Sequence, residues 1–405
     1  MEVFAVLNDG LPKPARNSIK GKVKEKSSPN KKWVLMAALL VVGLASFSFY
    51  KYHLSANLSQ SGQNKNMTKN PVAYEWYTKA KYRLTPENKG DIDSCILFLQ
   101  KAIAADSTFA LAYAELSRTY SIKNYFIDPK GGYSEKAFVE AEKALYLNPN
   151  LAEGYFAKAF CTWTFDNKFP HEKVIRQYKK AIALNPNMDE AYHQLSVVYK
   201  HVGLVDEGLE ADIKAVQINP DNKSAAIDSK GTNFFAQTKT GWEQLIDFYK
   251  KTPDHLITPF RASQWAMSLI NLGRVNEAEA MVLERLKKDS SDVFSNSVLA
   301  ILLAKKGDKA GALKRIAICE KKQLHTGHLH HALYQLATAY ALVGDKEKAL
   351  TALNYVADNG FPNYPFFKDD PLLVSLHDYP PYNELLNRLK ITWTTMKQIA
   401  QEKVE

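Results

Sequence analysis

The chain has 405 residues, of which 46% are hydrophobic, 24% charged and 11% aromatic. This composition excludes a fully disordered or collagen-like chain, and the length suffices for one large domain or two ordinary ones. The three cysteines, Cys95, Cys161 and Cys319, are far apart and form no C-x-x-C motif. That spacing excludes a zinc ribbon, a redox dithiol and a disulfide scaffold, while a single disulfide stays open.

Much of the net charge of +10 lies near the N-terminus. Residues 1–32 contain eight Lys or Arg and three Asp or Glu, which gives +5. A nucleic-acid-binding surface would interleave aromatic residues with these basic ones, and the basic cluster has none. We therefore expect a basic cytoplasmic tail over 1–32 and no nucleic-acid partner.

Residues 33–50 form an uncharged apolar segment, WVLMAALLVVGLASFSFY. As a helix its eighteen residues would extend about 27 Å, close to the hydrocarbon thickness of a bilayer. Lysines flank it on both sides, and Trp33 and Tyr50 suit the two interfaces. A cleaved signal peptide is the alternative, but more than thirty residues precede the segment and no A-x-A-like site follows it. The segment is thus predicted to be a single transmembrane helix.

The flanking charges predict the orientation of this helix. Eight basic residues precede it, whereas the twenty residues after it contain three. The positive-inside rule then places the N-terminus in the cytoplasm and the remainder of the chain on the periplasmic side of the inner membrane. Residues 51–70 are polar, lack any period and are predicted to be a linker.

The remainder of the chain contains a repeat of about 34 residues. Similar stretches are YAELSRTY at 113–120, YHQLSVVY at 192–199 and LYQLATAY at 333–340. Four segments end alike, as AEKALYLNP and YKKAIALNP do, at spacings of 42, 37 and 34 residues. This pattern of a large aromatic, a small residue and a closing proline resembles the tetratricopeptide (TPR) repeat. The resemblance covers 71–357 and implies an all-α superhelical solenoid of helix-turn-helix units.

Packing explains the residue types of the repeat. Small side chains would let the first (A) helix of a pair approach the second (B) helix, glycines would make the turn between them, and prolines would end each B helix. The small residues are Ser117, Ser196, Ala266, Ala300 and Ala337 in A helices and Ala137, Ala278, Ala312 and Ala349 in B helices; the turn glycines are Gly203, Gly273, Gly307 and Gly344; the prolines are Pro149, Pro186 and Pro220.

About seven helix pairs are expected, the first from Ala73 to Ser107. The signature is degenerate at 223–258, and the interval 121–136 should lengthen one internal turn by eight residues. Residues 358–405 are expected to form a C-terminal extension with capping helices.

A narrower resemblance concerns bacterial signalling proteins. The opening MEVFAVLNDGLPKPARNSIKGK is similar to the last strand and exit segment of class III adenylate/guanylate cyclase domains, and the segments around 74–120 and 366–386 resemble the repeats of membrane proteins that carry such domains. The resemblance implies the transmembrane-plus-TPR part of a cyclase-like receptor. The metal-binding aspartates of that family have no counterpart here, so the catalytic domain would be absent or on another chain.

No known catalytic or nucleotide-binding motif occurs, so we expect no enzyme activity and no cofactor. The segment HTGHLHHAL contains His325, His328, His330 and His331. Two imidazoles at i, i+3 could approach one metal ion, but no carboxylate or cysteine in the segment completes a ligand set. Exposed histidines at a helix start are the preferred interpretation, and no metal is predicted.

A peptide-binding groove is predicted on the inner, A-helix side of the solenoid. Phe156, Phe160 and Trp163 run at i, i+4, i+7 and are either core residues, which the usual behaviour of aromatic stripes favours, or ligand contacts. The corresponding groove positions nearby include Arg118, His193, Val197 and Lys200, and Arg118 and Lys200 are expected to face solvent. This mildly basic groove would suit an acidic peptide or a C-terminal carboxylate.

Three functional hypotheses follow. The first is a membrane-anchored TPR module that binds a protein or peptide in its groove and relays occupancy through the membrane helix. The second is the regulatory part of a nucleotide cyclase, and the third is an envelope-assembly scaffold. All three hypotheses are compatible with a homo-oligomer.

Overall fold

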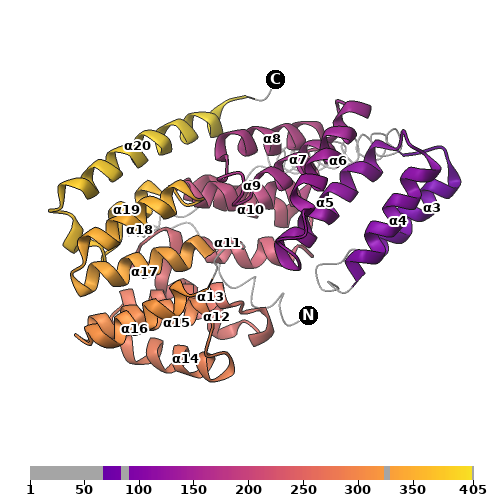
Figure 1. Ribbon diagram of the computed structural model, residues 1–405. Coiled ribbons are helices and arrows are strands. Elements are labelled where there is room, and N and C mark those ends of the chain that lie inside the picture. The colour runs from indigo at the N-terminus through magenta and orange to yellow at the C-terminus, as the bar shows by residue number, and fades with distance from the viewer. Residues whose placement is uncertain (1–66, 84–90, 323–328, 404–405) are drawn as a thin grey trace, which may run out of the picture. The chain divides into compact units, whose positions relative to one another are not determined.

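A computed structural model describes residues 67–83, 91–322 and 329–403 (Figure 1). The chain divides at Thr68 into two compact units, and the described helices belong to the second. The predicted transmembrane segment 33–50, the basic tail and most of the linker lie outside the described residues. None of the described helices is both long and apolar enough to cross a membrane.

The described part of Thr68–Glu405 is all-α. Eight successive helix pairs occupy it from Pro71 to Asp358: α3 (Pro71–Arg83) with α4 (Ile92–Ala105), α5 (Ala110–Phe126) with α6 (Tyr133–Leu147), α7 (Ala152–Thr162) with α8 (His171–Leu184), α9 (Asp189–His201) with α10 (Val205–Ile218), α11 (Lys223–Phe235) with α12 (Lys239–Lys251), α13 (Pro259–Asn271) with α14 (Val275–Lys288), α15 (Val293–Lys305) with α16 (Lys309–Glu320), and α17 (Leu329–Val343) with α18 (Lys346–Asp358). After them come α19 (Tyr364–Asp369) and α20 (Pro380–Gln401), and two short 3-10 helices, η2 (Asp254–Leu256) and η3 (Val374–Leu376), complete the described elements.

The predicted packing of small residues is confirmed. All nine small side chains predicted at the helix contacts are completely buried. Ser117 also donates a hydrogen bond from its hydroxyl to the carbonyl oxygen of Ala137, 2.6 Å away, which ties α5 to α6. Each A helix packs on its own B helix, and each B helix packs on the A helix of the next pair, as stacking repeats require.

The predicted turns and helix ends are confirmed too. The four turn glycines have φ angles between +74° and +94°, the left-handed region that L side chains rarely adopt. The helices α6, α8 and α10 end two residues before Pro149, Pro186 and Pro220.

Three details differ from the sequence-based expectations. There are eight pairs in the described residues, not about seven, because 223–258 contains a complete pair, α11 and α12. The interval 121–136 does not form only a longer turn, since α5 continues through its first half to Phe126. The C-terminal helix α20 packs on α18 and also on α8, which is far away in sequence (Figure 1).

Several polar contacts join this last helix to the middle of the array. Lys179 of α8 donates hydrogen bonds from Nζ to the carbonyl oxygens of Ile399, Ala400 and Glu402, at 2.6–2.8 Å. Met396 and Ile399 enter the same apolar cluster as Val174 and Tyr178. Residues 380–402 therefore cover part of the array as well as its end.

Candidate functional site

The A helices of four successive pairs contribute to one line of contacts. Lys81 of α3 pairs with Glu115 of α5 at 3.2 Å, and Arg118 of α5 pairs with Glu115 and with Glu190 of α9. The guanidinium carbon of Arg118 lies 5.8 Å from the ring centre of Phe156 on α7. We call these five residues the A-helix face.

Arg118 is the centre of the A-helix face. Its side chain is 20% exposed, Glu115 is almost completely buried, and Glu190 is 45% exposed. Burial raises the pKa of Glu115, but Lys81 and Arg118 outweigh that effect and lower it below the usual value. Glu115 is therefore an ionised, buried partner of Arg118, whereas Glu190 is a solvent-exposed partner of the same side chain.

The aromatic stripe of α7 is mainly core. Phe156 is buried, with its ring centre 5.7 Å from that of Tyr178, which favours the core interpretation for this residue. Phe160 and Trp163 are partly buried and pack at the edge of the same cluster. Lys158, on the same helix, forms an ion pair with Glu142 of α6.

The other basic groove residues belong to a buried ionic network. The Nζ of Lys200 lies 2.8 Å from a carboxylate oxygen of Asp212, and His193 Nδ1 lies 3.0 Å from the other oxygen. Arg261 of α13 and Asp228 of α11 continue the network at 2.9 Å. Burial would raise the pKa of Asp228, but Arg261, Lys200 and His193 outweigh it and lower that pKa to about 2.

The expected solvent exposure of Lys200 is therefore wrong. Its side chain and that of His193 are buried and already paired with carboxylates, while Val197 is partly buried. The carboxylates that neutralise this region were not predicted. Asp212 lies in the B helix of the same pair, and only the pairing of α9 with α10 could have indicated it. Whether these three residues contact a peptide stays a prediction.

The structure brings together part of the predicted histidine cluster. His330 and His331 lie at the start of α17, and His201, at the end of α9, joins them, with ligand-capable atoms of all three within 4.8 Å of one another. The expected exposure of His330 and His331 is wrong, because both are buried, as is His201. His325 and His328 lie outside the described residues. Sequence patterns did not indicate His201, since no repeat spacing relates it to α17.

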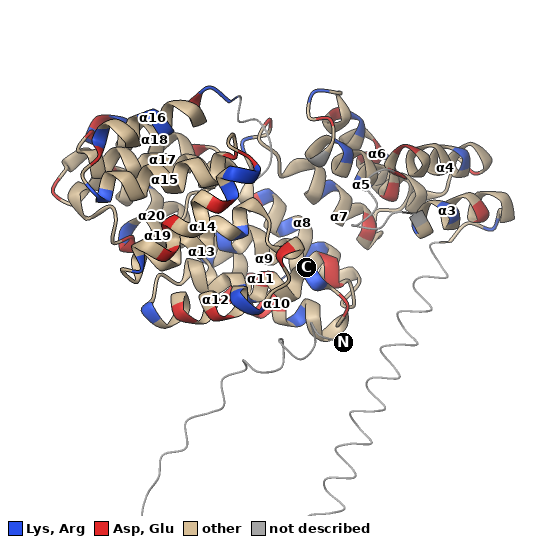
Figure 2. Cartoon of the chain, turned by 90° about the horizontal axis from the view of Figure 1, so that it is seen from below, with Lys and Arg blue, Asp and Glu red and all other residues tan. Residues whose placement is uncertain are grey.

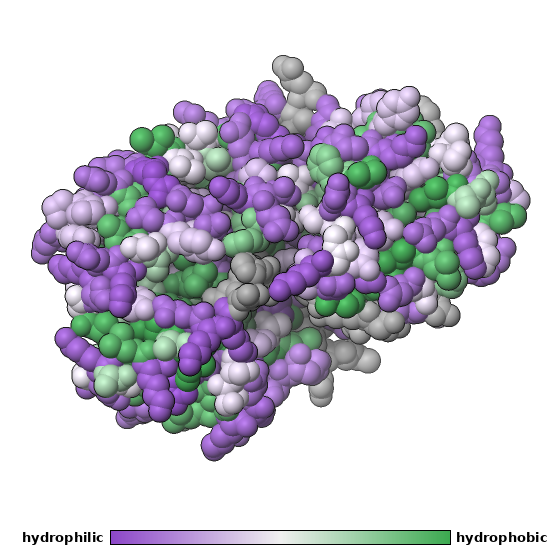
Figure 3. Space-filling model, in the orientation of Figure 1, coloured by the Kyte–Doolittle hydropathy of each residue, from purple (hydrophilic) through white to green (hydrophobic). Residues whose placement is uncertain are grey.

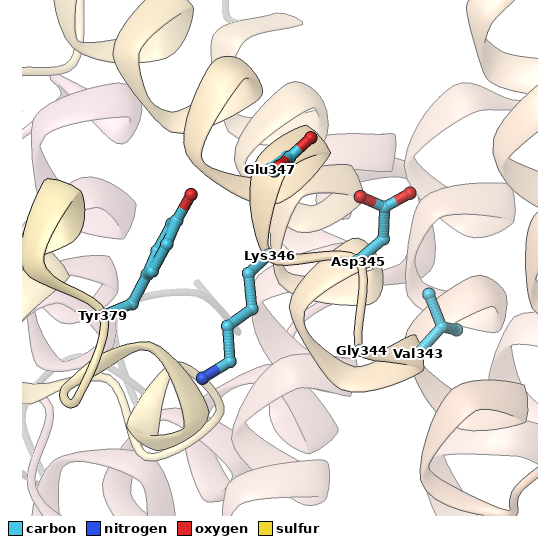
Figure 4. A pocket seen from close by; sticks show the side chains of 6 residues that line it. All are labelled: Val343, Gly344, Asp345, Lys346, Glu347 and Tyr379. Carbon is cyan, nitrogen blue, oxygen red and sulfur yellow. The ribbon is translucent and has the colours of Figure 1, made fainter.

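A shallow depression lies beside the turn between α17 and α18 (Figure 4). Its lining is Val343, Gly344, Asp345, Lys346, Glu347 and Tyr379. Asp345 caps α18, since its carboxylate accepts a hydrogen bond from the backbone N–H of Lys348 at 3.1 Å. Gly344 makes the turn at φ +94°. The structural roles of Gly344 in the turn and Asp345 at the helix N-terminus account for their presence in this depression, which is therefore not a candidate binding site.

Surface charge and surface apolarity have different distributions. Figure 2 shows basic and acidic residues interspersed along the helices. Figure 3 shows apolar surface among polar surface, including the region of α3 and α4. The first two pairs, with the turn inside the second, contain more than half of the exposed large apolar side chains in the described residues, namely Val72, Tyr74, Tyr82, Leu97, Ile127, Phe138, Val139 and Tyr146. Apolar contact area of this kind favours the N-terminal pairs as a binding surface.

Comparisons with known proteins show limited similarity. No protein-family model and no curated protein matches the chain. Among solved structures, MamA is similar at 26% identity over 40% of this chain and 87% of that chain, with a TM-score of 0.29. MamA from residue 41 to the end, from Desulfovibrio magneticus RS-1, is similar at 17% identity over 45% of this chain and 97% of that chain, with a TM-score of 0.33. YrrB, described as a TPR protein with an unusual peptide-binding site, is similar at 16% identity over 63% of this chain and 97% of that chain, with a TM-score of 0.26.

These TM-scores are low, so they do not establish a shared arrangement of helices. The TPR character rests on the chain itself: paired helices, buried small residues at the helix contacts and left-handed turn glycines. The cyclase resemblance gains no support from these comparisons, and residues 1–22, which carry its opening part, lie outside the described residues.

Proposed function

We propose that the chain is a non-enzymatic protein-interaction module that binds an acidic peptide segment, or a C-terminal carboxylate, on the A-helix face. The observation that carries the proposal is Arg118, a partly exposed guanidinium that three neighbouring A helices hold in place. Its contacts are Glu115 on its own helix, Phe156 on α7 and Glu190 on α9.

The proposed recognition is an exchange of carboxylates. A guanidinium can donate two parallel hydrogen bonds to a carboxylate, so a peptide carboxylate can replace Glu190 while Glu115 stays in place. Phe160 on α7 and Trp163, the residue after the last of α7, are partly exposed and would contact an apolar side chain of the same peptide. Lys200 and His193 already pair with the buried Asp212, so Arg118 is the cation proposed to meet the peptide.

The test uses a hexapeptide rich in Asp and Glu with a free C-terminus, and the same peptide with an amidated C-terminus. Each is titrated into the full chain in detergent, and binding is measured by calorimetry. Arg118→Ala should weaken binding by about 1–2 kcal/mol, the loss expected for one charge-assisted contact. Glu190→Gln should strengthen it, because the competing carboxylate is removed. Arg274→Ala is the matched control, since Arg274 forms an exposed pair with Glu277 on α14. Equal affinities for Arg118→Ala and Arg274→Ala would show that the A-helix face is not the site.

The proposal also includes the membrane. The eighteen uncharged residues at 33–50 and the basic residues before them support a single-pass anchor with the repeats on the periplasmic side. Binding at the repeats would then be relayed through that helix. Phosphatase reporter fusions at Lys32 and Glu405 test the orientation: activity at Glu405 alone supports it, and activity at Lys32 alone reverses it.

A further inference from the structure

Three buried histidines meet where two distant helix pairs touch. His201 ends α9, while His330 and His331 belong to the first turn of α17. The Nε2 atoms of His201 and His331 are 3.2 Å apart, although 130 residues separate the two in sequence. The exposed fraction of each of the three residues is 5% or less. The contact is therefore tertiary and shielded from bulk water.

Aromatic rings surround this histidine cluster and limit the movement of its imidazoles. Phe260 stacks on His331 with ring centres 4.6 Å apart, and Phe361 approaches the same ring edge-on at 4.6 Å. Trp163 lies edge-on to His201 at 5.0 Å. Among these apolar rings the three imidazoles are the groups best able to bind a metal.

The hydrogen bonding of His201 leaves one nitrogen suited to bind a metal. Its Nδ1 lies 2.7 Å from the carbonyl oxygen of Val197, a distance at which Nδ1–H donates. In the neutral imidazole the lone pair is then on Nε2, the atom that faces His331. A backbone carbonyl that fixes the tautomer in this way is the usual partner of a metal-binding histidine.

The distance between the two Nε2 atoms also agrees with metal coordination. Zinc–nitrogen bonds of 2.0–2.1 Å in a tetrahedral site place two ligand nitrogens about 3.3 Å apart. The separation of 3.2 Å between His201 and His331 is close to that value. One ligand-capable atom from each of the three residues lies within 4.8 Å of the others, so His330 must move toward the other two to complete a three-nitrogen set.

We propose that His201, His330 and His331 form a binding site for a zinc-class divalent transition metal, with water or a small anion as the fourth ligand. Neutral imidazoles suit zinc, cobalt, nickel and copper rather than magnesium or calcium, which prefer oxygen. The ion joins α9 to α17 and so cross-links the middle of the array to its last pair. Its three ligand residues differ from those proposed to bind the peptide at Arg118, although Trp163 lies beside both sites.

The experiment uses the full chain in detergent after chelator treatment and dialysis, with Co²⁺ and Zn²⁺ as probes. One equivalent of Co²⁺ should bind and give the visible absorption of a tetrahedral site, and Zn²⁺ should displace it and raise the melting temperature. His331→Gln should weaken binding by more than roughly 100-fold, because the loss of a residue that only orients a ligand already costs about 10–100-fold. His330→Gln repeats the test if His331→Gln does not fold, as judged by circular dichroism.

Two control variants test whether Co²⁺ binds at the three buried histidines. His255→Gln removes an exposed histidine of η2 and should leave Co²⁺ binding unchanged. The double variant His325→Gln/His328→Gln should also retain it. Absence of stoichiometric Co²⁺ binding overturns the proposal, as does loss of binding in this double variant with retention in His331→Gln. In that case the 3.2 Å contact is a hydrogen bond between two core histidines.

Discussion

The indole Nε1 of Trp393 donates a hydrogen bond to the carbonyl oxygen of Gly203 at 3.0 Å, across 190 residues of sequence. Gly203 is one of the turn glycines of the repeat, and the amide of Asn363 also bonds to the carbonyl oxygen of nearby Lys200, at 2.8 Å. The turn between α9 and α10 thus has two roles: it reverses the chain within a pair, and it receives α19 and α20.

The two roles of Gly203 can be separated by comparison with Gly273. Both have a positive φ, +80° and +74°. A Cβ added at Gly203 would lie 2.7 Å from Pro365 and 2.8 Å from Asn363, whereas one at Gly273 would meet nothing within 4 Å. Gly273→Ala should cost only the left-handed backbone strain of about 1–2 kcal/mol. Gly203→Ala should cost about 1–3 kcal/mol more, because the C-terminal segment must move.

Urea unfolding of the two glycine variants measures the difference. Limited proteolysis after Arg388 and Lys390 gives a second readout, since a displaced α20 should be cut faster in Gly203→Ala alone. Equal losses of stability in both variants would show that docking of the C-terminal segment does not depend on this turn.

Lys179 closes the C-terminal end of α20. Its Nζ donates to three carbonyl oxygens there, the groups that a helix end leaves without intrahelical partners. Lys179→Met should lower the unfolding free energy by about 1–2 kcal/mol and speed amide exchange in the last turn of α20. Lys173→Met, an exposed lysine of the same helix, is the control and should change neither. Equal exchange in the two variants would contradict this role of Lys179.

Lys200→Ala should destabilise the fold. Removal of one partner from a buried ion pair leaves the other charge in an apolar environment, at a cost of about 3–5 kcal/mol. Asp212 is completely buried but keeps its contact with His193, so a loss near 3 kcal/mol is expected. Thermal melts of Lys200→Ala and of Lys214→Ala, an exposed lysine of α10, measure it. Identical melting temperatures would contradict a structural role.

A double variant isolates the pair. Lys200→Met/Asp212→Asn removes both charges at once, so its loss of stability should be smaller than the sum of the two single losses. Additive losses would mean that Lys200 and Asp212 are not coupled.

Repeat spacing predicted the contacts between neighbours well. Ser196 and Ala137 had to be small because an adjacent helix touches them, and Gly203 had to be glycine because the turn needs a positive φ. The small residue and the glycine recur at the same positions in several repeats, so a single sequence is enough to show the pattern.

Contacts between distant repeats left no such pattern. The approach of His331 to His201 and of Trp393 to Gly203 each occurs once, and no spacing relates the partners. The charges of Lys200 and His193 were visible in the sequence, but their partner Asp212 is identified only when α9 and α10 are placed side by side. For that reason the predicted basic groove included residues that are buried and neutralised.

Asp370 gives a pH dependence of known sign. It is buried beside α17, and burial raises its pKa to about 6 despite hydrogen bonds from the Leu372 N–H and the Tyr334 hydroxyl, both at 2.8 Å. Between pH 4 and pH 6, taken from the usual Asp value of about 3.9 and the raised value, the folded state holds a proton that the unfolded state has lost. The free energy of unfolding should therefore fall as pH rises through this window, by roughly 3 kcal/mol in total.

Asp370→Asn should remove that fall. The side-chain amide is neutral at every pH, and the Tyr334 hydroxyl can accept from it. Relative to the unsubstituted chain, the variant should thus gain stability progressively from pH 4 to pH 7. Asp369→Asn is the matched control, because Asp369 is exposed and next in sequence. Urea unfolding at four pH values between 4 and 7 measures the three proteins. If the difference between Asp370→Asn and the unsubstituted chain does not vary with pH, the carboxyl group of Asp370 titrates alike in both states, and its burial has no linkage to folding.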